Sequence, residues 1–172
     1  MEVCSSLQEI TSMRWTFFLL LFVSFAAHAS DTSRLYNPHA NAAKDIATLL
    51  DRAKSEKKHL LIQVGGNWCV WCYRFNSFVQ TDTLLRKVLN DNFVVYHLNY
   101  SKENKNLDQL KRLGFPQRFG FPVLVVLDAS GTRLHTQDSA LLEKGNGYDS
   151  EKVKQFLKNW APAALQASIY SE

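Results

Sequence analysis

Hydrophobic positions along the chain follow two spacings, one helical and one typical of strands. From residue 41 to 55, apolar side chains recur every three or four positions, which predicts an amphipathic helix. The next run, residues 59–64, is short and apolar and stops at a pair of glycines, as buried strands do. Helical spacing returns over residues 69–79. A capping residue, Thr81 or Asp82, then predicts a second helix over residues 84–89.

The second half of the chain repeats this alternation. The predicted elements are a strand at 93–99, a helix at 107–113 closed by Gly114, a loop at 116–120, a buried strand at 122–127, a fourth strand at 132–136, and a last helix from Asp149 or Ser150 that stops before Pro162. Strands that alternate with helices and then close with a hairpin and a helix predict a three-layer α/β sandwich.

The beginning of the chain has a different pattern. Residues 15–27 form an almost uninterrupted apolar run of 13 residues, with Arg14 before it and the small-x-small sequence Ala27-His28-Ala29 at its end. These are the three parts of a secretory signal peptide, and the run is shorter than the roughly 20 residues that span a membrane. We expect residues 1–29 to be cleaved, with an uncleaved anchor as the alternative. Residues 30–172 then form one domain with its core at about 40–162, preceded by a polar, extended or flexible segment at 30–40.

Because of this leader, we expect the protein to be periplasmic or secreted. Charge and cysteine content narrow its possible functions further. After cleavage, 19 basic residues stand against 14 acidic ones, and both are scattered, which is typical of solvated helix faces and argues against a nucleic-acid partner. The mature chain keeps two cysteines, Cys69 and Cys72. One closely spaced pair closes too short a loop to stabilise a fold much, so reactivity explains it better than an inert structural disulfide.

The two cysteines lie where a strand is predicted to turn into a helix. Thiols three positions apart can switch between dithiol and disulfide. The free N–H groups and dipole of the helix start favour the thiolate, so Cys69 is the predicted nucleophile and Cys72 the resolving thiol. This chemistry requires Cys69 to be reachable from solvent. Haem attachment needs a histidine where Tyr73 stands, and zinc needs two further close ligands, whereas the histidines are single and far apart. We expect no metal and no cofactor.

The chain resembles exported bacterial thioredoxin-like proteins with a Trp-Cys-x-x-Cys site. The matching features are the sequence from Trp68 to Cys72 after a strand, Gly120-Phe121-Pro122 before the next buried strand, the turn at 127–131, and the tail from Gly145 to Trp160. The resemblance implies a single thioredoxin fold, with a central mixed sheet flanked by helices and an extra N-terminal helix.

The resemblance also implies roles for residues around the thiols. Pro122 is expected to follow a cis peptide bond beside the sulfurs, which suits a proline that opens a buried strand. Phe121 would then pair its backbone with an extended substrate segment. The substrate-binding residues are expected to be Trp68, Val70, Trp71, Phe121 and Pro122. For the two tryptophans, ordinary core packing is the alternative.

One position departs from the family pattern. Many thioredoxins carry a buried aspartate six residues before the first cysteine, where this chain has Gln63, which cannot take a proton. By strand alignment, His97 is the nearest candidate acid/base group; the alternative is a hydrogen-bonded packing histidine. The dipeptide Val70-Trp71 between the thiols leaves the redox potential, and hence the direction of exchange, open.

These features predict a monomeric thiol-disulfide oxidoreductase of the reductase or isomerase type. It would act on protein thiols and disulfides. Because the chain has no flavin or nicotinamide motif, a membrane or soluble redox partner would have to recycle it. A dedicated reductant of one client, such as apocytochrome thiols, is a narrower form of this hypothesis. The alternative from another class is a secreted thioredoxin-fold binding module or assembly chaperone without essential redox activity.

Overall fold

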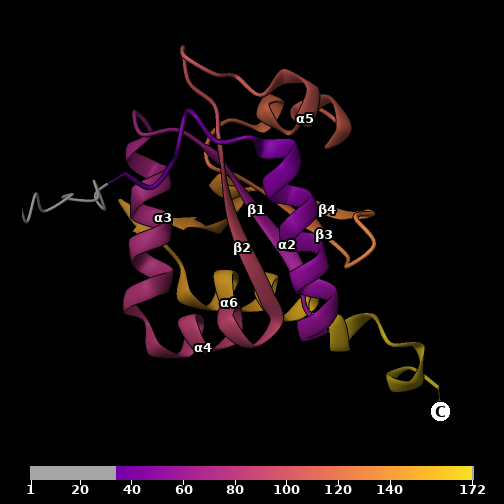
Figure 1. Cartoon of the computed structure of the whole chain (residues 1–172). Helices are drawn as coiled ribbons and strands as arrows, with labels where there is room; N and C mark the ends of the chain where they lie inside the picture. The colour runs from indigo at the N-terminus through magenta and orange to yellow at the C-terminus, as the bar shows by residue number, and fades with distance from the viewer. Residues whose placement is uncertain (1–33, 172) are drawn as a thin grey trace, which may run out of the picture. The chain divides into compact units, whose positions relative to one another are not determined.

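Four strands form one mixed sheet in the computed structural model, which describes residues 34–171 (Figure 1). The predicted signal peptide lies outside the described residues, so its cleavage stays a prediction. The strand order is β2-β1-β3-β4. β1 (His59–Gly65) pairs in parallel with β2 (Phe93–Asn99) and antiparallel with β3 (Val123–Leu127), which pairs antiparallel with β4 (Arg133–Asp138).

Helices cover both faces of the sheet because successive strand residues point to opposite sides. Leu60, Ile62 and Val64 of β1 pack with α2 (Ala42–Glu56) and with Leu110 of α5 (Leu107–Arg112). Leu61 joins the opposite cluster. The helices on that side are α3 (Val70–Thr81), α4 (Thr83–Asn92) and α6 (Ser150–Asn159). The predicted three-layer sandwich with an extra N-terminal helix is therefore confirmed, and Figure 1 shows α2 in front of the sheet.

Side-chain caps fix where the helices begin. Asn41 accepts a hydrogen bond from Lys44 N at the start of α2, and Asp149 caps α6 in the same manner. Asp82 accepts from two backbone N–H groups at the start of α4 and also receives the hydroxyl of Ser150. Asp82 therefore ties the starts of α4 and α6 together beside the helix that follows the cysteines.

Some predicted boundaries differ from the structure. The third strand begins at Val123 and the fourth covers Arg133–Asp138. A 3-10 helix, η1 (Pro116–Phe119), stands where a loop was expected. The short elements that the sequence pattern missed are η2 (Ser139–Leu142), β5 (Glu143–Lys144), β6 (Gly147–Tyr148), η3 (Pro162–Leu165) and η4 (Ala167–Ile169). Each is too short to show a hydrophobic period.

The segment before α2 departs furthest from prediction. The sequence predicts a polar, extended or flexible approach over residues 30–40, but the Tyr36 side chain is 0% exposed. Burial of a whole tyrosine ring fixes this part of the segment against the domain. Among the described residues, no helix is long and apolar enough to cross a membrane.

Candidate active site at the Cys69–Cys72 disulfide

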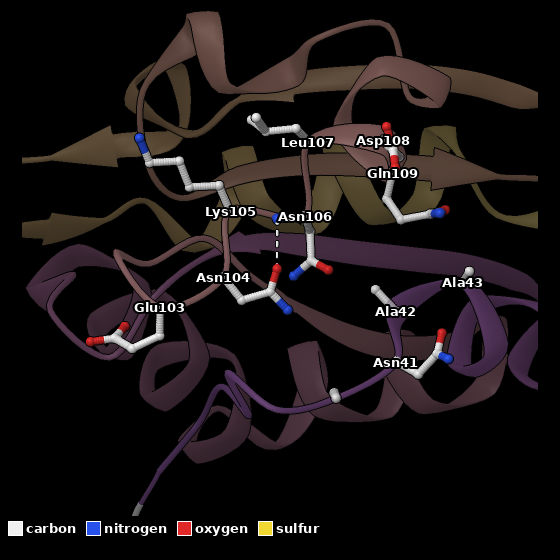
Figure 2. Close-up of a pocket in the computed structure, with 11 residues that line it drawn as sticks. Asn41, Ala42, Ala43, Glu103, Asn104, Lys105, Asn106, Leu107, Asp108 and Gln109 are labelled. Carbon is white, nitrogen blue, oxygen red and sulfur yellow. Dashed lines mark hydrogen bonds between the residues drawn. The ribbon is translucent and has the colours of Figure 1, made fainter.

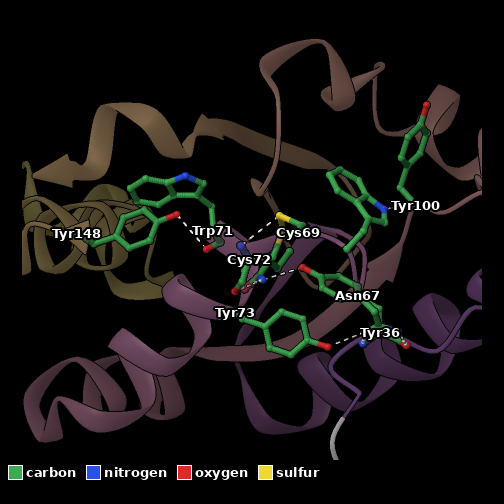
Figure 3. The surroundings of a disulfide bond; sticks show 10 residues. Tyr36, Asn67, Cys69, Trp71, Cys72, Tyr73, Tyr100 and Tyr148 are labelled. Atoms are coloured by element: carbon green, nitrogen blue, oxygen red, sulfur yellow. Dashed lines mark hydrogen bonds between the residues drawn. A yellow bond between two sulfur atoms is a disulfide. The ribbon is translucent and has the colours of Figure 1, made fainter. Parts of the chain in front are cut away.

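The two cysteines lie at the junction of β1 and α3, as expected, and are joined by a disulfide (Figure 3). Cys69 is extended and forms the N-cap of α3; its Sγ accepts a hydrogen bond from Cys72 N at 3.1 Å. The sulfur of Cys69 therefore faces the first backbone N–H groups of the helix. That environment stabilises negative charge, so it would favour a thiolate at this position once the disulfide is opened.

The disulfide is less exposed to solvent than thiol-disulfide exchange at Cys69 was expected to require. Cys72 is 0% exposed and Cys69 only 4% exposed. Leu35, Trp71 and Phe121 pack around the two cysteines and Tyr36. The expectation that Cys69 is open to solvent is thus wrong for the disulfide state. Movement of one of these covering groups would make Cys69 more accessible to an incoming sulfur atom.

Aromatic side chains line one side of the disulfide. Trp68 is 56% exposed, and its indole N–H donates to Tyr100 O at 2.8 Å. Its ring meets the edge of Phe121 at 5.3 Å, and Phe121 stacks on Tyr100 at 4.9 Å. A Cβ added at Gly66 would overlap Trp68 Nε1 and lie 2.7 Å from Tyr100 O, so this glycine leaves room for the indole. The core-packing alternative for Trp68 does not fit a ring that is more than half exposed.

The other predicted contact residues lie around the same disulfide. Val70 is 62% exposed, whereas Trp71 is partly buried between Tyr148, at 5.7 Å from ring to ring, and the guanidinium of Arg74. The Tyr148 hydroxyl donates to Trp71 O at 3.3 Å. The Phe121–Pro122 peptide bond is cis. Because Phe121 packs against the cysteines, this bond lies close to the disulfide.

A buried polar group replaces the acidic residue that the sequence lacks. Gln63 is 3% exposed and pairs in register with His97 on β2. Its side-chain N–H groups donate to the Tyr36 hydroxyl at 2.7 Å and to Cys72 O at 3.1 Å. The His97 ring meets the edge of the Tyr36 ring at 5.6 Å, and burial lowers the pKa of His97 to about 4. His97 is therefore a neutral neighbour of Tyr36, and its buried Nε2 has no hydrogen-bond partner among residues 34–171.

Asn67 fastens the N-terminal segment beside the disulfide. Its Oδ1 accepts from Tyr36 N at 3.0 Å, and its Nδ2 donates to Tyr36 O at 2.8 Å. The Tyr73 hydroxyl donates to the same Oδ1 at 2.8 Å and accepts from Leu35 N at 3.2 Å. Figure 3 draws Asn67, Tyr73 and Tyr36 on one side of the Cys69 sulfur, with Asn67 next to Tyr36. The Asn67 side-chain amide therefore bonds both the N–H and the C=O of Tyr36, as the backbone of a neighbouring strand would.

Sequence reasoning did not identify four residues that build this site: Tyr36, Asn67, Tyr73 and Tyr100. Asn67 and Tyr73 flank the Trp-Cys-x-x-Cys sequence, and this adjacency was the available signal for both. For Tyr36, the signal was the pair Leu35-Tyr36, which is apolar and aromatic within an otherwise polar stretch. A long-range contact across 27 residues leaves no periodic trace in sequence.

A separate pocket of about 550 Å³ lies between the start of α2 and residues 103–109 (Figure 2). Asn104 shapes it: its Oδ1 accepts from Asn106 N at 3.0 Å and its Nδ2 donates to Pro38 O at 3.1 Å. These contacts explain how the polar stretch after β2 is held in place. None of the residues that line the pocket belongs to the cluster around the disulfide. Within residues 34–171, no group of three His, Cys, Asp or Glu side chains could hold a metal ion.

Comparisons with known proteins agree with this architecture. The sequence model of a family described as thioredoxin-like matches residues 41–129. A disulphide isomerase from Xylella fastidiosa Temecula1 has a similar structure, with a TM-score of 0.64 and 22% identity over 73% of this chain and 95% of that one. The oxidised C-terminal domain of Neisseria meningitidis DsbD has a TM-score of 0.51 and 16% identity over 70% and 97% of the two chains. No curated protein sequence matches. At these identities, the structural likeness shows the fold alone.

Proposed function

This chain belongs to the thioredoxin-like family, as its sequence predicts, and from that premise we propose that it is a thiol-disulfide oxidoreductase acting on protein disulfides. The observation that carries the proposal is the position of the Cys69 sulfur at the start of α3, in hydrogen-bond contact with Cys72 N. When a disulfide at this position is reduced, the start of the helix stabilises the thiolate of Cys69.

The proposed cycle uses both cysteines. In the dithiol form, the Cys69 thiolate attacks one sulfur of a client disulfide, forming a mixed disulfide and releasing the other client sulfur. Cys72 then loses its proton and attacks Cys69 Sγ. The Cys69–Cys72 disulfide forms, two electrons pass to the client, and the departing client sulfur takes up a proton. The reverse sequence oxidises a client dithiol, and the redox potential of the pair sets the direction.

The aromatic groups beside the disulfide suit a protein client. Trp68 and Val70 flank Cys69 in sequence and are mostly exposed, and Phe121 contacts both the Trp68 ring and the cluster that contains the cysteines. Exposed apolar side chains next to a reactive sulfur provide contact area for an unfolded or extended segment. We assign substrate contact to Trp68, Val70, Trp71, Phe121 and Pro122.

Insulin reduction by dithiothreitol tests the proposal, because separated insulin chains precipitate and scatter light. The wild-type protein is expected to accelerate precipitation well beyond the uncatalysed rate, whereas Cys69→Ser is expected to leave it at that rate. Cys72→Ser is the matched control, since it keeps the nucleophile but removes the resolving thiol. Equal rates for wild type and Cys69→Ser would refute the proposal.

A second candidate function is a thioredoxin-fold binding module or assembly chaperone whose disulfide is structural. The 4% exposure of Cys69 favours it, as does the neutral Gln63 at the position of a buried acid. This alternative predicts that Cys72→Ser traps no covalent partners and that partner binding survives removal of both thiols. The exchange mechanism predicts the opposite in both experiments.

We also propose that the protein is a monomer and that it works outside the cytoplasm; the leader pattern at residues 15–29 supports the location. A membrane or soluble thiol protein would then recycle the pair. Mass spectrometry of partners trapped on Cys72→Ser distinguishes a general oxidoreductase from a dedicated reductant of one client, such as apocytochrome thiols. Many trapped partners indicate the first, and one dominant partner indicates the second.

A further inference from the structure

The resolving sulfur faces a tyrosine that reaches it from outside the Cys-x-x-Cys helix. A Cβ added at Gly65 would overlap Cys72 Sγ and lie 2.7 Å from the Tyr36 hydroxyl oxygen. The two atoms therefore border the same small gap above Gly65. Tyr36 and Cys72 are each 0% exposed, so no bulk solvent separates them.

The hydrogen bonds of Tyr36 leave its own proton free to be donated. Its hydroxyl oxygen accepts from Gln63 Nε2, and among the hydrogen bonds found in residues 34–171 none has this hydroxyl as the donor. In the disulfide, Cys72 Sγ is a poor acceptor. Once the bond opens, the sulfur can become a thiolate, whose negative charge makes it a much better acceptor than either the disulfide or the neutral thiol.

We propose that the Tyr36 hydroxyl donates a hydrogen bond to Cys72 Sγ whenever the disulfide is open, and so stabilises the thiolate of the resolving cysteine. Tyr36 would then serve in place of the buried acid that Gln63 has replaced, although by a different route: it keeps its proton and acts as a donor. In the second half of the exchange cycle, the proton lost by Cys72 ends on the departing client sulfur.

The surroundings of the gap suit a permanent donor. Burial raises the pKa of Tyr36 far above its usual range, so the hydroxyl stays protonated. Gln63 holds both partners, because its amide donates to the Tyr36 oxygen and to Cys72 O. Asn67 fixes the Tyr36 backbone with two hydrogen bonds. Together these contacts orient the hydroxyl before the disulfide opens, which lowers the cost of forming the new bond.

The other titratable groups near the gap do not compete for this role. His97 of β2 meets the Tyr36 ring by its edge and is neutral, because burial lowers its pKa to about 4. Tyr73 of α3 directs its hydroxyl to Asn67. Tyr148 of β6 directs its hydroxyl to Trp71 O, and burial raises its pKa to about 12.

The test measures the pKa of Cys72 directly, by the ¹³Cβ chemical shift in a Cys69→Ser background, where Cys72 is a lone thiol. Tyr36→Phe in that background keeps the ring but removes the donor. It is expected to raise the pKa of Cys72 by about one unit, since a hydrogen bond to a charged group is worth at least that much. Tyr148→Phe removes a hydroxyl that points elsewhere and is expected to leave the pKa unchanged.

An unchanged Cys72 pKa in folded Tyr36→Phe overturns the inference. A second measurement needs no substitution: the hydroxyl proton of Tyr36 is expected to become slowly exchanging and visible by NMR on reduction of the wild type, and its absence also counts against the inference. The inference draws its importance from the proposed exchange reaction, but neither measurement needs turnover. If Tyr36→Phe leaves the pKa of Cys72 unchanged but the wild type reduces insulin, only the role of Tyr36 is refuted. If the pKa of Cys72 shifts but the wild type does not reduce insulin, only the proposed enzymatic function is refuted.

Discussion

Replacing Asn67 with alanine removes the side chain that fastens the N-terminal segment over the disulfide. Three hydrogen bonds are lost: those from Tyr36 N and from the Tyr73 hydroxyl to Oδ1, and that from Nδ2 to Tyr36 O. Each contributes about 0.5–1.5 kcal/mol net, but Asn67 is exposed, so water replaces part of this. We expect the free energy of unfolding to fall by about 2 kcal/mol and Tm by about 5 °C.

The same change is expected to expose the disulfide. Tyr36 forms one buried cluster with the two cysteines and Leu35 packs against that cluster, so loosening their backbone raises the population in which Cys69 is reachable. At 1.4 kcal/mol per factor of ten, a loss of about 2 kcal/mol raises the rate of reduction by dithiothreitol up to about 30-fold. Urea unfolding of the oxidised protein gives the first quantity, and the change in tryptophan fluorescence during reduction gives the second.

Two control variants sharpen this experiment. Asn67→Asp keeps the acceptor for Tyr36 N and the Tyr73 hydroxyl but loses the donor to Tyr36 O, so its effects should be intermediate. Asn92→Ala removes the hydrogen bond of another asparagine, to Val88 O in α4, and should not change the reduction rate. A destabilised Asn67→Ala protein that is reduced at the wild-type rate would show that the N-terminal segment does not control access to Cys69.

Other predictions test the site and the fold. Trp68→Ala removes an exposed ring and its hydrogen bond to Tyr100 O. It should slow insulin reduction severalfold but leave the reduction of the Cys69–Cys72 disulfide by dithiothreitol unchanged. Equal slowing of both reactions would contradict a role of Trp68 in client binding. Asp82→Ala removes the cap of α4 and lowers Tm at pH 7. Because backbone hydrogen bonds lower the pKa of Asp82, its stabilisation is complete above about pH 4 and is lost as pH falls through the lowered value, so the two melting curves should converge in acid; a gap that stays constant refutes this. Leu157→Ala opens a cavity at a 0% exposed position and should cost about 3 kcal/mol in urea unfolding, whereas less than about 1 kcal/mol would contradict the packing described for α6.

Much of the sheet and of the main helices could be predicted from sequence because their signals are local. The apolar run of β1 ends at two glycines, and Asp82 precedes a new helix at a short distance along the chain. The pair Cys69 and Cys72 was identified in the same way, from its spacing and its place after a strand. Local signals of this kind depend on neighbouring residues alone.

The polar interior of the site could not be predicted, because it depends on contacts between distant residues. Tyr36 looks like part of a polar approach segment until Asn67 and Gln63 are seen to bind it across about 30 residues of chain. The 4% exposure of Cys69 has the same origin, since the covering residues come from the N-terminal segment, α3 and the segment before β3. His97 was placed correctly beside Gln63 by strand register, but its burial, which keeps it neutral, is a property of the folded domain.

The redox potential of the Cys69–Cys72 pair, measured by equilibration of the mature protein with glutathione or dithiothreitol buffers, tests the central claim most directly. A disulfide built for exchange should titrate as one two-electron couple between about −270 and −120 mV, the range from thioredoxin to DsbA. A potential below about −300 mV is that of a structural disulfide, and it would contradict the account.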